Sequence, residues 1–303
     1  MQFSSGIAQE RVDENAAKIG DLAYWAMLEE VYTFPKPGLV DLYSNGAHKD
    51  MDVSTFERSA AALKPYFTLM AMEGIKNSKE PETVFANIRK LGLDAEKAMY
   101  GATAGVNTHK GLIFNMGILS AAVGACIGED KTVTIECLME MEQAMVRKTL
   151  LKEVSEMRDF TSNGEKNLQE YGTMGARGEA ISGYRSVCSI SLPVMSEGLK
   201  NGREWNRIKL ETLFALMSQV DDSNIIARHD PGILKEVQVT AEAFLKAGGA
   251  YRDDAISILE QMDGDFINKN ISAGGCADLL AVTIFLAGLV WKSKIPGLSQ
   301  NNP

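Results

Sequence analysis

The chain has 303 residues, and its 40 Asp and Glu residues outnumber 31 Lys and Arg residues, which gives a formal net charge of −9 at pH 7. This balance opposes extended electrostatic attraction to nucleic acid or to an anionic membrane, so neither is expected as a partner. The four cysteines form no CxxC pair, which argues against a zinc knuckle or a redox dithiol and fits a reducing cytoplasm.

The first predicted element is a helix. Residues 1–12 lack the basic start and apolar block of a signal peptide, and we expect them, like residues 296–303, to be flexible tails. Apolar residues then recur every three or four positions from Val12 to Ala26, which is the spacing of an amphipathic helix. The same spacing occurs over 54–75, 131–146, 207–220 and 232–247. Strand-like alternation is nearly absent, so we expect one all-α domain over residues 1–303, a multi-helix bundle with a polar site at helix ends and loops.

A long polar connector runs from Glu30 to Asp52. About twenty residues without helical periodicity are long for a simple connection between two helices. Two prolines stiffen the connector, and Gly38 and Gly46 permit unusual backbone angles, so it can present polar side chains in a fixed array. The alternative is a solvated loop with a charge cluster. The candidate site residues here are Lys36, Asp41, His48, Lys49, Asp50 and Asp52.

The segment 105–111, Gly-Val-Asn-Thr-His-Lys-Gly, precedes an uncharged stretch. Asn107 or Thr108 can cap a helix start there. The free N–H groups of that start, with His109 and Lys110 beside them, would bind phosphate oxygens. An ordinary cap followed by a chance basic pair would look the same.

Two uncharged stretches, 111–128 and 279–291, require a membrane test. The first reaches the ~18 residues that can span a bilayer, but it contains Asn115, Ser120 and four glycines. The second is too short. We therefore expect both to be helices buried at the centre of a globular core.

Ser, Asn and Gly cluster between residues 160 and 178, which predicts a loop inside the domain. In the segment 172–180, small residues leave Arg177 and Glu179 clear of their neighbours just before a helix. An Arg side chain can grip a phosphate through two N–H groups. The glycines could equally serve only a tight turn.

Asp221, Asp222 and Asn224 follow the helix 207–220, and Arg228 comes soon after them. Adjacent carboxylates with a nearby amide are hard oxygen ligands, which suit Mg²⁺ that bridges substrate phosphates. An acidic turn at a helix end is the alternative, because Asp stabilises the start of the next helix. All three histidines lie in polar segments of this kind, which favours a shared pocket.

The last polar segment, 271–278, leads into the second uncharged stretch. Gly274 and Gly275 would let the backbone approach a ligand. Asp278 would then lie in the first turn of an apolar helix, where a buried carboxylate needs a partner. That partner would be a metal ion, a basic residue from another motif, or the helix's own N–H groups.

Taken together, these segments resemble the signature set of the triphosphoribosyl-dephospho-coenzyme A synthase family over residues 30–285. The matching segments read PKPGLVD, NGAHKDMD, GVNTHKG, GARGEA, DDSN with a following Arg228, and SAGGCADLLA. Six motifs in register are far more specific than any one of them. The last departs from the family pattern SPGGSADLL at Ala273 and Cys276, and it keeps the glycines and Asp278.

The resemblance implies an enzyme that moves the 5-triphosphoribosyl group of ATP to the 2′-hydroxyl of 3′-dephospho-CoA and releases adenine. The product would be the prosthetic-group precursor of citrate lyase or malonate decarboxylase, passed on to a transferase that modifies an acyl carrier protein. The family's product carries an α linkage whereas ATP is β-linked, which implies a single inverting displacement. A homodimer is one assembly that we consider.

The resemblance also implies roles for the candidate residues. Breaking the bond between ribose and adenine builds oxocarbenium character that a carboxylate can stabilise, while the triphosphate stays bound. Mg²⁺ is expected at Asp50, Asp52, Asp221 and Asp222. The base for the acceptor hydroxyl is one of Glu179, Asp41 and Asp278, and His109 is a further catalytic candidate. The expected ligands of ATP and dephospho-CoA are Lys36, His48, Lys49, Asn107, Thr108, Lys110, Arg177, Asn224, Arg228, Gly274 and Gly275.

Two other functions fit the same residues. A Mg²⁺-dependent nucleotide N-glycosidase or phosphohydrolase would use water as its acceptor and would release product without dephospho-CoA. A noncatalytic nucleotide- or CoA-binding module would bind and show no turnover.

Overall fold

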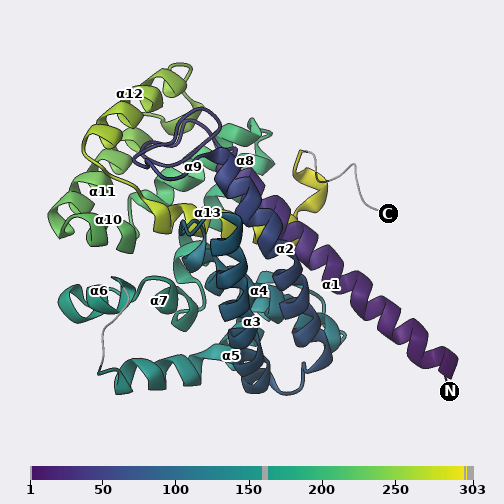
Figure 1. The fold of residues 1–303 in the computed structure, drawn as a ribbon. Helices are drawn as coiled ribbons and strands as arrows, with labels where there is room; N and C mark the ends of the chain where they lie inside the picture. The colour runs from purple at the N-terminus through teal and green to yellow at the C-terminus, as the bar shows by residue number, and fades with distance from the viewer. Residues whose placement is uncertain (1, 159–162, 297, 299–303) are drawn as a thin grey trace.

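The computed structural model describes residues 2–158, 163–296 and 298, and it contains no β-strand within those ranges (Figure 1). The expected all-α fold is confirmed. The α-helices are α1 (Gln2–Val31), α2 (Val53–Lys76), α3 (Pro81–Ala102), α4 (Lys110–Gly128), α5 (Ile135–Glu156), α6 (Asn163–Tyr171), α7 (Gly175–Ile181), α8 (Leu192–Lys200), α9 (Trp205–Met217), α10 (Ser223–Arg228), α11 (Pro231–Lys246), α12 (Ala255–Asn268) and α13 (Gly274–Val290). A π-helical turn, η1 (Val187–Ser191), precedes α8, and two 3₁₀ turns, η2 (Gly249–Tyr251) and η3 (Lys292–Lys294), follow α11 and α13.

Several helices begin at side chains that accept backbone N–H groups. Asp52 caps α2, Thr134 caps α5, Asp222 caps α10 and Asp230 caps α11. Such caps satisfy donors that have no partner inside the first turn. The short polar residues between the apolar stripes therefore fix where these helices start.

The two helices α2 and α4 approach each other closely because glycine faces backbone on both sides. A Cβ atom on Gly74 of α2 would lie 2.0 Å from the carbonyl oxygen of Ala121. A Cβ atom on Gly124 of α4 would lie 2.1 Å from that of Ala71. No larger residue fits at either position without moving a helix. Glycines within the uncharged stretch 111–128 therefore serve helix packing.

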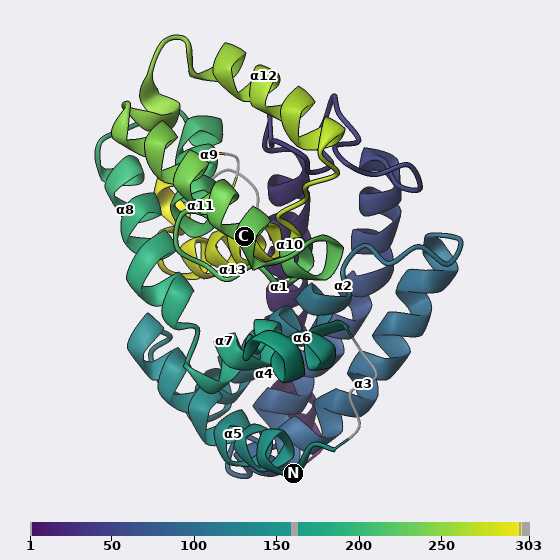
Figure 2. The ribbon, with the colours of Figure 1, turned by 90° about the vertical axis from the view of Figure 1, so that its left-hand side faces the viewer.

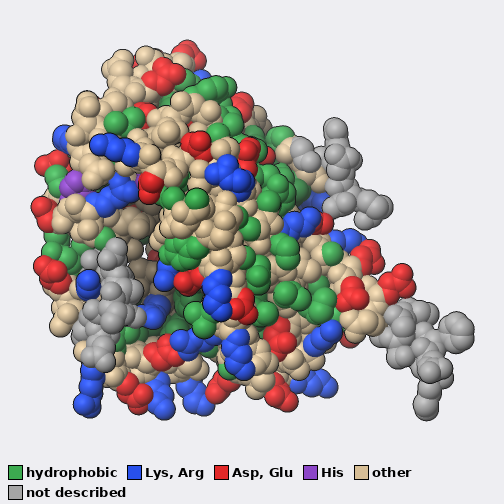
Figure 3. Space-filling view, in the orientation of Figure 1, with side chains coloured by type: hydrophobic (Ala, Val, Ile, Leu, Met, Phe, Trp, Pro, Cys, Tyr) green, Lys and Arg blue, Asp and Glu red, His purple; other side chains and the backbone are tan. Residues whose placement is uncertain are grey.

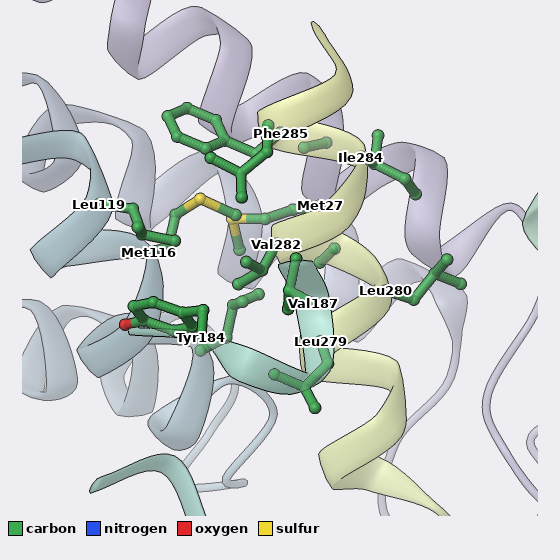
Figure 4. Packing of buried hydrophobic residues seen from close by; sticks show 14 of the residues in the cluster. Met27, Met116, Leu119, Tyr184, Val187, Leu279, Leu280, Val282, Ile284 and Phe285 are labelled. Carbon is green, nitrogen blue, oxygen red and sulfur yellow. The ribbon is translucent and has the colours of Figure 1, made fainter. Parts of the chain in front are cut away.

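The core is one continuous cluster of buried hydrophobic residues that extends from Ala16 to Ile295. Its centre is α13, which packs against α1, α4 and α9. Figure 4 shows Val282 and Phe285 of α13 beside Met27 of α1 and Met116 of α4. The two uncharged stretches are therefore central helices, as predicted. By length and composition α4 could cross a membrane, but 78% of its apolar window is buried inside the protein, as in the core helix of a globular fold.

Two of the predicted segments differ from the structure. The predicted loop over 160–178 was wrong for most of its length, because α6 and the start of α7 occupy it. Glu, Lys, Leu and Gln favour a helix in α6, and this short helix packs against α10. At the N-terminus, α1 begins at Gln2, where we expected a tail through residue 12. Of the expected C-terminal tail, residues 297 and 299–303 lie outside the described residues.

Candidate active site

Asp41 holds the long connector in shape. Its carboxylate accepts hydrogen bonds from the backbone N–H groups of Lys36 at 2.9 Å, Tyr43 at 2.8 Å and Ser44 at 2.9 Å. The side chain is buried, so these bonds replace its hydration. Asp41 is thus fully engaged in folding the segment that carries Lys36.

The connector is pinned to the segment before α13. Gly38 has φ +71°, and a Cβ atom there would lie 2.1 Å from the carbonyl oxygen of Ile271. Its N–H donates to Asp263 at 2.8 Å. Only glycine combines this backbone angle with so close an approach. The contact brings the first and last polar motifs of the sequence together.

Lys36 and Glu30 form a buried ion pair behind the connector. The Lys36 Nζ donates to the Glu30 carbonyl oxygen at 2.9 Å and also contacts the Glu30 carboxylate. Burial raises the pKa of Glu30, and the charge of Lys36 opposes that rise. The same lysine charge reaches His109, so the pair lies close to the start of α4.

His109 is buried and neutral at the start of α4. Its Nδ1 lies 2.7 Å from the Ser59 hydroxyl oxygen, and that oxygen accepts a hydrogen bond from the Thr108 hydroxyl, also at 2.7 Å. Ser59 is buried, and within the described residues Nδ1 is the only acceptor that its hydroxyl hydrogen reaches, so we assign that hydrogen to Nδ1 and the imidazole proton to Nε2. Burial, with the charge of Lys36, lowers the pKa of His109 to about 3. The edge-on ring of Phe56 fixes the imidazole plane at a centroid distance of 4.9 Å.

Asp222 joins the starts of α10 and α13. One carboxylate oxygen accepts from Asn224 N at 2.8 Å and Ile225 N at 3.3 Å, and the other accepts from Cys276 N at 2.7 Å. A Cβ atom on Gly275 would lie 3.0 Å from Asp222, which explains a glycine at that position. Burial raises the pKa of Asp222, and these hydrogen bonds oppose the rise.

Asp278 faces the start of α4 from α13. The helix begins at Gly274, so Asp278 lies beyond the first turn in which we placed it. A Cβ atom on Gly111 would lie 2.5 Å from the Asp278 Oδ2, which places this carboxylate against the α4 backbone. Burial, together with the charges of Glu30 and Asp222, raises the pKa of Asp278 well above its usual value. Among the described residues, no protein group donates a hydrogen bond to this partly exposed carboxylate.

Glu179 is the remaining candidate carboxylate, and it lies on α7. It accepts a hydrogen bond from the Ser186 hydroxyl at 2.5 Å, and burial raises its pKa. Burial raises the pKa of the Cys276 thiol, and the charges of Asp222, Glu179 and Asp278 raise it further, so all three carboxylates act on the start of α13. In Figure 2, α6 and α7 lie beneath α10 and α13. Figure 3 shows a hollow on the surface between these two parts of the molecule.

Arg228 forms a basic edge to the site and connects three motifs. It donates to the carbonyl oxygen of Ala47 at 3.2 Å and to the Asn270 side chain at 3.3 Å, and its Nη2 lies 3.2 Å from the His48 ring. His48 in turn lies 3.0 Å from the Ser272 hydroxyl. Burial, with the charge of Arg228, lowers the pKa of His48 to about 4, so His48 is neutral at pH 7.

The residues predicted to bind Mg²⁺ have different surroundings. Asp52 caps α2 by accepting from Thr55 N at 2.8 Å, and Asp222 is engaged as described above. Asp221 is exposed and lies 3.4 Å from Gln238, and exposed Asp50 exerts its charge on Arg228. Within the described ranges no group of three or more His, Cys, Asp or Glu side chains is arranged to bind a metal ion. These four carboxylates therefore do not fit a resident metal centre.

Other predicted residues lie around the site or at its rim. Lys110 pairs with Glu96 at 3.1 Å, and Asn107 accepts a hydrogen bond from the Lys110 N–H at 3.1 Å. His109, rather than Asn107 or Thr108, is the N-cap residue of α4. Arg177 lies on α7 two residues before Glu179, and Lys49 is exposed on the connector. A Cβ atom on Gly274 would lie 3.0 Å from the Asn224 amide, so these two predicted ligands are neighbours.

Several polar residues near the site were not predicted. Ser59 and Glu142 occupy buried positions on helices, and Glu142 lies between Leu138 and Val146 at a spacing of four. Burial raises the pKa of Glu142 to about 8. A polar residue inside an apolar stripe was the available signal in both cases. Glu30 was noted only as the start of the connector, and its ion pair with the predicted residue Lys36 is visible only in the folded structure.

This all-α scaffold gathers carboxylates, a neutral histidine and an arginine near the ends of its helices, an arrangement that suits an enzyme with a phosphate-bearing substrate. Residues 16–296 match the family model CitG, described as ATP:dephospho-CoA triphosphoribosyl transferase. The chain belongs to this family, and the resemblance inferred from its motifs is confirmed. Its reaction class is therefore the transfer of a triphosphoribosyl group.

Similar proteins carry consistent names. The Photobacterium profundum protein "Probable 2-(5''-triphosphoribosyl)-3'-dephosphocoenzyme-A synthase" is 37% identical over 271 residues, which cover 89% of this chain and 86% of that protein. The Klebsiella pneumoniae 2-(5''-triphosphoribosyl)-3'-dephosphocoenzyme-A synthase is 38% identical over 264 residues, covering 86% and 87% of the two chains. A Vibrio cholerae relative is 37% identical over 280 residues, covering 91% and 90%. No solved structure matches the chain.

Proposed function

We propose that this protein transfers the triphosphoribosyl group of ATP to the 2′-hydroxyl of dephospho-CoA at the junction of α4, α7, α10 and α13. Family membership supports the reaction, and the surroundings of Asp278 support the location. Asp278 is the predicted base candidate whose carboxylate accepts no hydrogen bond from the described residues, and it faces the start of α4. A base needs such a free oxygen, because it must accept the substrate's proton.

In the proposed step, the bond between ribose C1′ and adenine N9 breaks while C1′ bonds to the acceptor 2′-oxygen. Asp278 takes the proton of the acceptor hydroxyl, the departing adenine takes a proton from solvent water, and Asp278 then returns its proton to solvent, so no net proton is released. Its raised pKa makes Asp278 a stronger base than an ordinary aspartate. The displacement is a single step that inverts the configuration at C1′.

The other two base candidates receive different roles. Asp41 already accepts three backbone hydrogen bonds, so we assign it to holding the connector. Glu179 belongs to α7, which lies on the opposite side of α13 from the connector in Figure 2, and burial raises its pKa. We propose that its carboxylate stabilises the positive charge that develops on the ribose.

Neutral and cationic donors would bind the phosphates. His109 would donate its Nε2 hydrogen, and Arg228 with His48 would contact phosphate oxygens at the basic edge. The N–H groups at the start of α13, near Gly274 and Gly275, and the amide of Asn224 add further donors. Lys49, Lys110 and Arg177 lie on segments around this group and would contribute charge.

We further propose that Mg²⁺ enters as part of the nucleotide substrate, with exposed Asp50 and Asp221 facing its bound waters. The remaining expectations are proposals of the same kind: a cytoplasmic location, a homodimer, and delivery of the product to a transferase that modifies the acyl carrier protein of citrate lyase or malonate decarboxylase.

The proposal is tested by incubating the protein with ATP, Mg²⁺ and dephospho-CoA, followed by mass spectrometry. We expect free adenine and the joined product in equal amounts. Adenine or phosphate released from ATP without dephospho-CoA would indicate a hydrolase instead. Binding of both substrates without any release would indicate a noncatalytic module. A trapped ribosyl adduct of the protein would refute the single displacement.

A further inference from the structure

A cavity of about 290 Å³ lies between α11 and α12, beside the segment that leads into α13. No residue predicted for the site lines it. This volume is at the lower end of the roughly 300–1,000 Å³ of small-molecule sites. The cavity is therefore large enough for a slender organic group.

The cavity and the candidate active site share a wall. Ile271 and Phe266 line the cavity, and both also pack against Gly38 of the connector, where a Cβ atom would lie 2.1 Å from Ile271 O and 3.0 Å from Phe266 Cβ. The next residues along the chain face the site, since Asn270 bonds to Arg228 and Ser272 to His48. The basic edge thus lies between the start of α13 and the cavity.

The lining favours a neutral, amphipathic occupant. Val237, Ile258 and Met262 supply apolar surface, while Thr240 and Gln261 supply hydrogen-bonding groups. The Thr240 hydroxyl donates to the Glu236 carbonyl oxygen at 2.8 Å, and its oxygen and the exposed Gln261 amide can still bond to a polar ligand. An amide-bearing chain with aliphatic segments matches both kinds of surface.

The charges around the cavity disfavour phosphate. Glu236 and Asp265 line it together with a single cation, Lys269, whose ammonium lies 3.6 Å from the Glu236 carboxylate. The net charge of the lining is negative, so an anionic group would be repelled. Phosphates are better served at the adjacent basic edge of Arg228 and His48.

We propose that this cavity binds the pantetheine arm of dephospho-CoA. The inference rests on the proposed function, because it names where the acceptor of that reaction is held. The acceptor ribose would lie at Asp278, its diphosphate along Arg228, and its amide-bearing arm between α11 and α12. This order follows the order of groups in the molecule itself.

Thr240→Phe tests the proposal, because it fills the cavity from α11. Val239→Phe is the matched control, since Val239 is the preceding residue, is 52% exposed and does not line the cavity. We expect Thr240→Phe to raise KM for dephospho-CoA about tenfold and to leave KM for ATP and kcat unchanged. Val239→Phe should change none of the three.

A truncated acceptor distinguishes binding of the pantetheine arm from binding of the nucleotide. ADP retains the ribose and diphosphate but lacks pantetheine, so its competitive inhibition constant against dephospho-CoA should be the same in Thr240→Phe and in the original protein. An unchanged KM for dephospho-CoA, or an equal rise in KM for ATP, would overturn the proposal. If Thr240→Phe fails to fold, Met262→Trp fills the same cavity from α12 and takes its place. Absence of adenine release from the unaltered protein would instead refute the proposed function.

Discussion

The Ser59 hydroxyl lies 2.7 Å from Nδ1 of His109, and within the described residues Nδ1 is the only acceptor that its hydrogen reaches, so we assign Ser59 as the donor. This relationship fixes the tautomer of a buried, uncharged imidazole. His109 therefore carries an N–H donor at Nε2 rather than a positive charge. The sequence suggested a basic pair of His109 and Lys110, whereas the structure gives the two residues different characters.

Ser59→Ala should free the imidazole to adopt either tautomer and should lower kcat about fivefold, since one net hydrogen bond is worth about 1 kcal/mol. Nitrogen chemical shifts of the His109 ring, measured by NMR, would report the tautomer directly. The control is Ser120→Ala on α4, because Ser120 is equally buried and its hydroxyl has no hydrogen-bond partner in the described part of the chain. A Ser59→Ala protein that keeps both the Nε2–H tautomer and full activity would contradict the assignment.

Asp278→Asn should lower kcat by about 10²-fold or more, as expected for loss of a general base. The melting temperature should hold or rise, because the folded state of the original protein disfavours the ionised carboxylate. In the original protein kcat should increase as pH rises through the raised pKa of Asp278, since a base must be ionised to accept a proton. Adenine release measured across pH checks both statements.

The comparison variant for Asp278 is Asp41→Asn. The Asn side chain would turn an amide N–H group toward backbone N–H groups that donate hydrogen bonds to the Asp41 carboxylate. This change should destabilise the fold by about 1–3 kcal/mol. Denaturant unfolding gives this free energy. A large loss of kcat in Asp41→Asn without loss of stability would move the role of base from Asp278 to Asp41.

Asp222→Ala should destabilise the fold strongly while Asp221→Ala should not. The Asp222 change leaves the buried N–H group of Cys276 and the start of α10 without their acceptor, at a cost of about 3 kcal/mol or more. Exposed Asp221 should contribute less than about 0.5 kcal/mol. Thermal unfolding of the two variants side by side is the measurement, and equal melting temperatures would show that Asp222 does not join α10 to α13.

Glu142→Gln should change how stability depends on pH. The pKa of Glu142 is raised to about 8 in the folded protein, so between its unfolded value near 4.5 and pH 8 only the unfolded chain is ionised. The contribution of Glu142 to stability is therefore highest at low pH and declines as pH rises through this window. Glu142→Gln removes that decline and should be more stable than the original by at least about 1 kcal/mol at pH 8. The measurement is the free energy of unfolding of both proteins at pH 5 and at pH 8. The same difference between the two proteins at both pH values would disprove the titration of buried Glu142.

Much of the architecture was predictable from the order of residues. Apolar residues at a spacing of three and four identified α2, α9 and α11 within a few positions, because that spacing reflects a local property of the helix. The six motifs are also local stretches of sequence, and they identified the family. The helix α6 was missed, since its polar composition resembles a loop and its packing against α10 is not a local property.

The sequence by itself determined the helices, the family and the set of polar residues that the site draws on. Only the tertiary structure decided what each polar residue does, because a carboxylate's role depends on which donors reach it. Asp222 receives its decisive N–H group from Cys276, 54 residues further along the chain, while its neighbour Asp221 points to solvent. Desolvation and charges brought close by folding likewise raise the pKa of Asp278, whereas Asp41 receives three backbone N–H groups. None of these effects can be read from spacing along a chain.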